Sequence, residues 1–375
     1  LDEAQAATTR ATAAAAEAER QRQRALGAAA QAESERQRAI EAADRERRAS
    51  VEAAEQARRA EGVKTFLSGI FETGSVENPD GVQARSRTVG QLIEDSAARV
   101  LTELDDTPRV KLDLLRTLGT IAGGLDLGET SEKLLTADIA LSQRLGEPPA
   151  VMAERHLARH AMFAGRRLGS QARLELQAAL ARARQVPGDA GRFLQGRVQG
   201  ALARDLGVGS LFRDGRAELE QAIALLAPAH ADSLAYLDTQ NLLGQRLVYA
   251  DGQATRGLAL LRTTADAIDA HPQSRPSDRH RARLDLAVAL YRAQQPQEAL
   301  HEIDRLVAAL AASHEPRSLF ALQVHNERIV MLSGASQRER AYAAALEAAD
   351  LAAPLRSAAG QRRHSEFKRL AGLLA

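Results

Sequence analysis

The chain has 375 residues, of which 45% are hydrophobic, 26% are charged and only 3% are aromatic, and it contains no cysteine. The 50 basic and 49 acidic residues give a formal net charge of +1, so no excess positive charge is present to attract nucleic acid or an anionic membrane. The absence of cysteine excludes disulfide frameworks, thiolate zinc sites and cysteine nucleophiles. Strong helix formers dominate the composition, and we expect an all-α protein.

Residues 1–72 are predicted to form one long helix. This segment contains no proline, and 22 of its first 60 residues are alanine. At 1.5 Å per residue the helix would be on the order of 100 Å long. Over residues 1–61 the charges balance, with 11 arginines against 12 acidic residues, which excludes a basic nucleic-acid-binding arm.

A heptad frame that starts at Ala4 gives this helix a seam of alanines. Of the 18 a and d positions up to Val63, 14 are apolar, a pattern typical of a coiled coil. We therefore expect a homodimer with a seam that includes Ala11, Ala18, Ala25, Ala32, Ala39, Ala53 and Ala60. Alanine buries little surface, so the seam is weak. The alternative is a solvated single helix held by Arg–Glu pairs at i,i+4 spacing.

Residues 73–87 are predicted to be a hinge loop. They contain the sequence Asn78-Pro79-Asp80-Gly81. Proline prevents the helix from continuing, and Asp-Gly favours a turn. This is the main domain boundary that the sequence indicates.

From residue 88 to residue 375, helical signals recur in pairs with a period of about 40 residues, as in stacked helical hairpins. The predicted helices are 88–104, 107–123, 128–145, 149–165, 170–186, 188–206, 214–229, 231–250, 252–271, 275–294, 296–313, 315–333, 335–353 and 360–374, the last being a cap. The period predicts an α-solenoid.

The packing pattern within the pairs favours tetratricopeptide-like hairpins. Such a hairpin needs a large and then a small residue where its two helices cross, and small or aliphatic residues facing them from the second helix. The clearest case is Leu286-Ala287 with Ala299, Ile303 and Leu306. A second candidate is Leu118-Gly119 with Leu134 and Leu135, which departs from the pattern at Ser131 and Asp138. A third is Leu243-Gly244 with Leu260, where Arg256 occupies a small-residue site.

In this register, Asn241, Gln245, Arg281 and Tyr291 are expected on the concave face of the solenoid. Polar side chains there can hydrogen-bond an extended peptide backbone, and Arg281 can pair with a carboxylate. We expect a protein or peptide partner on this face. The alternative is ordinary solvated surface.

The chain shows no catalytic constellation. His156 and His160 are four residues apart, a spacing found in metal sites, but no Glu follows the first His as metalloproteases require. We therefore predict no catalytic residue, no metal site and no cofactor for this chain.

Residues 61–145 resemble the segment that follows the membrane helix in bacterial serine/threonine protein kinases with a C-terminal tetratricopeptide region. The matching residues are Phe66-Leu67, Ile70-Phe71, Asn78-Pro79, Thr88-Val89, Leu92-Ile93, Ala97-Ala98-Arg99-Val100, Glu103-Leu104, Pro108, Val110, Leu114-Leu115 and Leu118-Gly119. The chain departs from the family pattern at Gly90 and at Glu94-Asp95.

The resemblance implies a cytoplasmic kinase domain that uses ATP and Mg, and one membrane helix, both upstream of Leu1. This chain would then lie on the periplasmic side of the inner membrane. It contains no Gly-rich nucleotide loop, His-Arg-Asp or Asp-Phe-Gly motif, so it would be a non-catalytic sensor region that relays partner binding through the long helix. The alternative is a soluble, cytoplasmic tetratricopeptide scaffold or regulator with no kinase attached.

Overall fold

The computed structural model describes residues 2–72, 88–125, 127–210, 212–312, 318–355 and 358–375. The chain divides into two compact units, Leu1–Ser86 and Arg87–Ala375. All regular elements in the described ranges are helices, as the composition predicts. The predicted hinge at 73–87 lies outside the described residues.

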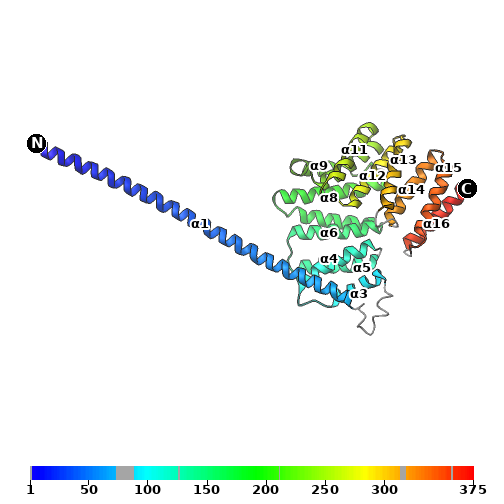
Figure 1. The fold of residues 1–375 in the computed structure, drawn as a ribbon, viewed down its shortest axis with the longest axis horizontal. Helices are drawn as coiled ribbons and strands as arrows, with labels where there is room; N and C mark the ends of the chain where they lie inside the picture. Colours follow the sequence, from blue (N-terminus) through cyan, green and yellow to red (C-terminus); the bar gives the residue numbers. More distant parts are fainter. Residues whose placement is uncertain (1, 73–87, 126, 211, 313–317, 356–357) are drawn as a thin grey trace. The chain divides into compact units, whose positions relative to one another are not determined.

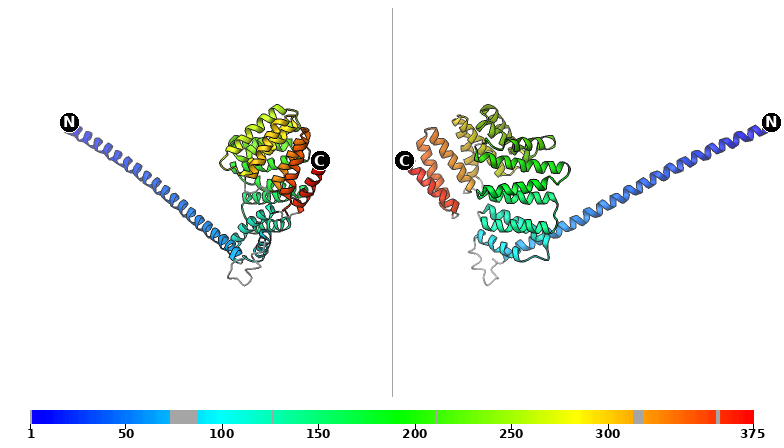
Figure 2. Two further views of the ribbon diagram at one scale, coloured as in Figure 1. Left: turned by 45° about the vertical axis from the view of Figure 1, so that its right-hand side comes forward. Right: turned by 180° about the vertical axis from the view of Figure 1, so that it is seen from behind.

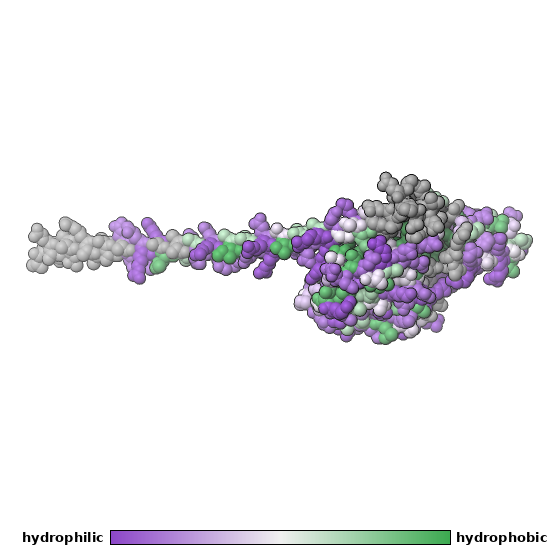
Figure 3. Space-filling model, turned by 90° about the horizontal axis from the view of Figure 1, so that it is seen from below, coloured by the Kyte–Doolittle hydropathy of each residue, from purple (hydrophilic) through white to green (hydrophobic). Residues whose placement is uncertain are grey.

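The first unit contains a single helix of 71 residues, α1 (Asp2–Glu72). Alanine favours the helix throughout, and polar pairs one turn apart add to it, such as Arg59 with Glu55 at 2.6 Å. Figure 3 shows hydrophilic side chains along the described part of α1, with isolated hydrophobic ones between them. A surface of this kind gives one isolated helix little to bury.

The seam predicted along α1 stays a prediction, because a single chain does not test it. Ala32, Ala39, Ala53 and Ala60 are exposed, and the side chains of Ala11, Ala18 and Ala25 lie outside the described ones. The larger apolar residues Leu26, Ile40 and Val51, 56%, 47% and 61% exposed, stand at b or f positions of the heptad frame. They therefore add nothing to the seam.

The second unit contains helices at every position predicted from residue 88 onward, with ends that differ by a few residues. They are α3 (Val89–Thr102), α4 (Pro108–Gly124), α5 (Gly128–Arg144), α6 (Pro149–Gly165), α7 (Gly169–Ala183), α8 (Gly188–Gly209), α9 (Arg216–His230), α10 (Leu234–Tyr249), α11 (Ala254–Ala270), α12 (Pro276–Arg292), α13 (Pro296–Ala311), α14 (Leu319–Gly334), α15 (Arg338–Ala352) and α16 (Ala358–Leu374). Figures 1 and 2 show them stacked in chain order, from cyan to red.

Antiparallel hairpins are the repeating element of this unit. Each even-numbered helix from α4 to α14 packs most extensively against the odd-numbered helix that follows it, and α16 packs on α15. Successive even-numbered helices also contact each other. In the described ranges, successive odd-numbered helices from α5 to α15 do not contact each other to a comparable extent. The even-numbered helices therefore form the inner layer of a curved solenoid. We call its open side the inner face.

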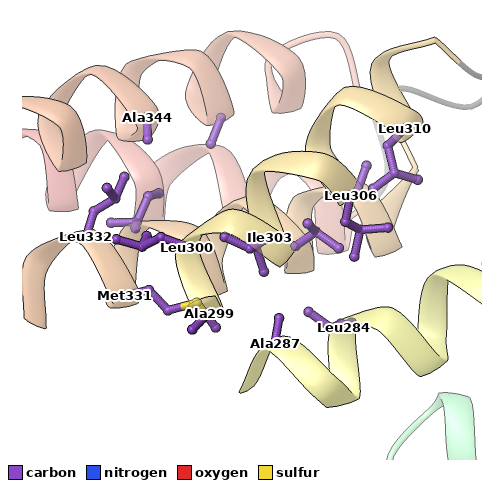
Figure 4. Packing of buried hydrophobic residues seen from close by; sticks show 14 of the residues in the cluster. Leu284, Ala287, Ala299, Leu300, Ile303, Leu306, Leu310, Met331, Leu332 and Ala344 are labelled. Atoms are coloured by element: carbon purple, nitrogen blue, oxygen red, sulfur yellow. The ribbon is translucent and has the colours of Figure 1, made fainter. Parts of the chain in front are cut away.

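The helix crossings follow the predicted large-small pattern. Ala287, Ala299 and Ile303 are fully buried, and Figure 4 shows them in one cluster with Leu306 and with Met331 of α14. At the first hairpin, a Cβ atom on Gly119 would lie 2.9 Å from Cδ2 of Leu135. Glycine avoids this clash, which lets α4 and α5 pack closely at the crossing.

The crossing of α10 and α11 differs from the prediction by one residue. A Cβ atom on Gly244 would lie 2.7 Å from Cγ of Leu261 and 3.2 Å from the carbonyl oxygen of Gly257. The facing residue is therefore Leu261, and the prediction of Leu260 was wrong. The small residue that faces Gly244 from α11 is Gly257 and not Arg256, the residue that the predicted register placed there. The large residue that follows by one turn shifts with it, from Leu260 to Leu261.

Two polar residues at core positions of α5 are satisfied by hydrogen bonds, as buried polar groups require. Ser131 donates its hydroxyl to the carbonyl oxygen of Gly119 at 2.7 Å. Asp138 pairs with Arg155 of α6. Among the described helices, none has a stretch that is both long and apolar enough to cross a membrane.

Candidate binding face

Polar side chains connect the even-numbered helices from α6 to α12 in succession. Each interacts with a residue of a neighbouring inner helix. We call this group the polar ladder: His160, Arg204, Asp205, Asp238, Asn241, Arg281 and Asp285.

The first part of the ladder joins α6, α8 and α10. The Asp205 carboxylate accepts a hydrogen bond from Nε2 of His160 at 3.0 Å. The neighbouring Arg204 pairs with Asp238 at 2.7 Å, and this carboxylate raises the pKa of the Arg204 guanidinium. Adjacent residues of α8 therefore tie it to the inner helices on either side.

A cavity of about 210 Å³ opens beside these contacts. Its lining residues are His160, Arg197, Gly200, Ala201, Arg204, Ala235, Asp238 and Thr239. Gly200 leaves room here, since a Cβ atom at this position would already lie 3.2 Å from Oγ1 of Thr239. The cavity offers charged groups of both signs and a hydroxyl to a bound molecule.

The second part of the ladder joins α10 and α12. Nδ2 of Asn241 donates a hydrogen bond to Oδ2 of Asp285 at 2.7 Å. Asn241 is 1% exposed, and its Oδ1 has no hydrogen-bond partner among the described residues. Burial raises the pKa of Asp285 above its usual range, and this effect outweighs the opposing effects of Arg204, Asn241 and Arg281.

The four residues predicted for the binding face have different surroundings. Asn241 and Arg281 both lie near Asp285, and the guanidinium of exposed Arg281 lies 5.4 Å from the ring centroid of Phe320 in α14. Gln245 is buried. The half-buried Tyr291 packs beside Gly334 between α12 and α14.

Sequence reasoning missed five members of this polar group: His160, Arg204, Asp205, Asp238 and Asp285. Asp285 follows Arg281 by one helical turn, so helical periodicity alone could have placed it on the same face. The other partners depend on how successive hairpins stack, which the sequence pattern did not reveal.

The two histidines with the spacing of metal ligands contact separate carboxylates. Nδ1 of His156 lies 2.8 Å from Glu175, and His160 is held by Asp205. Within the ranges that the structure covers, no group of three or more His, Asp or Glu side chains is arranged to hold a metal ion.

A second cavity, of about 410 Å³, lies between α4, α5 and α6. Its walls are mostly glycine, alanine and aliphatic side chains, and Leu319 at the start of α14 also lines it. The solenoid therefore curves enough to bring its sixth hairpin towards its first.

The fold is similar to those of solved helical-repeat proteins. The Rap protein complexed with competence and sporulation factor matches with a TM-score of 0.52 and 12% identity, over 85% of this chain and 86% of that chain. NprR in complex with its cognate peptide NprX gives 0.47 and 11%, over 84% and 81%. A putative kinesin light chain of Podosopora anserina with TPR-like repeats gives 0.41 and 21%, over 56% and 100%.

No family model matches the chain, and neither does any curated protein. The structural likeness, at these low identities, concerns the fold alone. The second unit is an all-α, tetratricopeptide-like solenoid, as predicted.

Proposed function

We propose that this chain is the non-catalytic sensor region of a bacterial membrane serine/threonine protein kinase. In this function the solenoid binds a protein or peptide on its inner face. The long helix relays that binding by dimerisation, which brings two kinase domains together. The chain would then lie on the periplasmic side of the inner membrane.

The observation that carries the binding function is the polar ladder with its adjoining cavity. Charged and polar side chains from successive inner helices meet on this face and pair with one another, and the cavity opens beside them. Concave solenoid faces are suited to such ligands. The Rap protein, which shares the fold, is complexed with competence and sporulation factor in its structure.

The kinase context rests on the resemblance of residues 61–145 to the juxtamembrane and first-repeat segment of that kinase family. Dimerisation rests on the heptad pattern of α1. Its alanine seam buries little area, so a ligand that adds a small free energy would shift the equilibrium between monomer and dimer. A weak seam therefore suits a reversible switch better than it suits a permanent dimer.

Binding is tested with the full chain on an array of random-sequence heptapeptides, followed by fluorescence-polarisation titration of the peptides that bind. Gly200→Leu fills the cavity between α8 and α10. We expect it to weaken binding at least about tenfold, a loss of roughly 1.4 kcal/mol. The control is Ala343→Leu, at an exposed position of α15, which should leave binding unchanged.

Two results would contradict the binding function. In one, no heptapeptide binds to the wild-type chain. In the other, Gly200→Leu binds the selected peptides as tightly as Ala343→Leu does, while both variants keep the circular dichroism spectrum and melting temperature of the wild type.

The kinase context has its own test, which is the coding sequence upstream of Leu1. We expect a span of about 20 apolar residues, preceded by a Gly-rich loop, a His-Arg-Asp motif and an Asp-Phe-Gly motif. If the upstream sequence lacks these motifs, the solenoid belongs to a scaffold or regulator without a kinase.

A further inference from the structure

We infer that Asp285 and Asn241 form a cation subsite on the inner face, which takes the guanidinium or ammonium group of a basic residue in the bound peptide. This inference rests on the proposed peptide-binding function. It adds a charge preference that the polar ladder as a whole does not specify.

The first support is that Asp285 lacks an ion pair. Its one hydrogen bond from a side chain comes from the neutral amide of Asn241, at 2.7 Å. In the described ranges, no nitrogen of a basic side chain lies within 4.0 Å of this carboxylate. The two arginines whose charges act on Asp285 have other contacts, since Arg204 pairs with Asp238 and Arg281 lies against Phe320.

The second support is an acceptor without a donor beside that carboxylate. Oδ1 of Asn241 has no partner among the described residues, although the side chain is almost fully buried. Buried acceptors are nearly always paired. The unpaired amide oxygen and the carboxylate belong to two hydrogen-bonded side chains. Two such acceptors, one of them charged, suit a group with several N–H donors, and ammonium and guanidinium groups carry three and five.

The third support is the electrostatic balance at the site. Burial raises the pKa of Asp285, the arginines Arg204 and Arg281 only partly offset this, and Asp238 adds to it. The carboxylate is therefore less well stabilised than it would be in water. A cation placed against it would supply the missing stabilisation, whereas a ligand carboxylate would add to the repulsion.

The test compares arginine with citrulline, which has nearly the same shape but no charge. Heptapeptides selected on the wild-type chain are resynthesised with each Arg replaced by citrulline and each Lys by norleucine. Dissociation constants are measured for the wild type, for Asp285→Asn and for a control, Asp350→Asn, which removes an exposed carboxylate from α15.

On the wild type and on Asp350→Asn, we expect one basic position at which the neutral replacement weakens binding at least about tenfold, as for a hydrogen bond to a charged group. On Asp285→Asn, the basic peptide and its neutral counterpart should have dissociation constants within about twofold of each other. Asp285→Ser serves as a second variant if Asp285→Asn does not keep the wild-type circular dichroism spectrum.

The possible failures are distinguishable. If heptapeptides bind but show no charge preference, or if the preference persists in both Asp285 variants, the cation subsite is wrong and the peptide-binding function stands. If no heptapeptide binds to the wild type, the proposed function fails and the subsite fails with it.

Discussion

Nη1 of Arg155 in α6 lies 2.5 Å and 2.7 Å from the two carboxylate oxygens of Asp138 in α5, joining the first hairpin to the second through a buried ion pair. The two residues are 5% and 1% exposed. A buried pair of this kind gains Coulomb energy but loses the hydration of both charges. Its two members therefore depend strongly on each other.

Removing one member of this pair should destabilise the solenoid far more than replacing both. We expect Arg155→Ala to lower the free energy of unfolding by about 3–5 kcal/mol, because it leaves a buried carboxyl without a partner. The double variant Asp138→Leu/Arg155→Met should be close to the wild type. Urea unfolding followed by tyrosine fluorescence measures this, since all four tyrosines lie in the second unit.

The control for this experiment is Arg216→Ala, which breaks the exposed pair with Glu220 and should barely move the urea midpoint. If the double variant loses as much stability as Arg155→Ala alone, the two side chains do not act as a pair.

Asp138 should also make stability depend on pH. Burial outweighs the attraction of Arg155 and raises the pKa of Asp138 to about 6, from an ordinary value of 3.8. Between these values the folded state binds a proton that the unfolded state does not, so the contribution of this group falls as the pH rises from 4 to 6. We expect the free energy of unfolding of the wild type, relative to Asp138→Asn, to be higher at pH 4.5 than at pH 7.5. A difference that is the same at both pH values would contradict this.

The glycine crossing of α10 and α11 should not accept a side chain. A Cβ atom on Gly244 would lie 2.7 Å from Leu261, which is fully buried. Gly244→Ala should therefore cost about 1–3 kcal/mol by overpacking. Gly124→Ala is the matched control, because a Cβ atom there meets nothing within 4 Å. Equal urea midpoints for the two variants would show that this crossing tolerates a methyl group.

The helices and their hairpin pairing could be predicted because their signals are local. Proline and glycine mark the helix ends, and the large and small residues of one crossing lie within a few turns of each other, as with Leu286 and Ala299. The one error at α10 and α11 came from choosing Leu260 instead of Leu261. A one-residue shift rotates a helix by about 100°, enough to change which side chain faces the crossing.

The polar ladder could be predicted only in part. The repeat register predicts that Asn241 and Arg281 lie on one face. Their partners are distant in sequence, since the hydrogen bond from Asn241 to Asp285 spans 44 residues and that from His160 to Asp205 spans 45. These contacts depend on how successive hairpins are rotated against each other. Many packed side chains set that rotation together, and no local motif encodes it.

Self-association through α1 should depend on which alanines are replaced. Ala32→Glu/Ala39→Glu places charges at two a positions of the predicted seam, whereas Ala30→Glu/Ala54→Glu adds the same charges at f and b positions. Both pairs are exposed in the single helix, so neither should unfold it. Sedimentation equilibrium of the full chain should show a weaker dimer for the first variant alone. Equal effects of both variants, or a monomeric wild type, would remove the coiled-coil interpretation.

Tyr291 of α12 packs so closely against α14 that position 334 should accept only glycine, and the tyrosine hydroxyl should be the main reason. A Cβ atom on Gly334 would lie 1.8 Å from the Tyr291 hydroxyl oxygen and 2.9 Å from Cζ. Gly334→Ala should therefore lower the free energy of unfolding by about 1–3 kcal/mol, because a rigid ring has to move. Adding Tyr291→Phe removes the atom that clashes most, so the double variant should recover part of this loss in urea unfolding. If Tyr291→Phe gives no recovery in the Gly334→Ala background, the hydroxyl is not what requires glycine at this position.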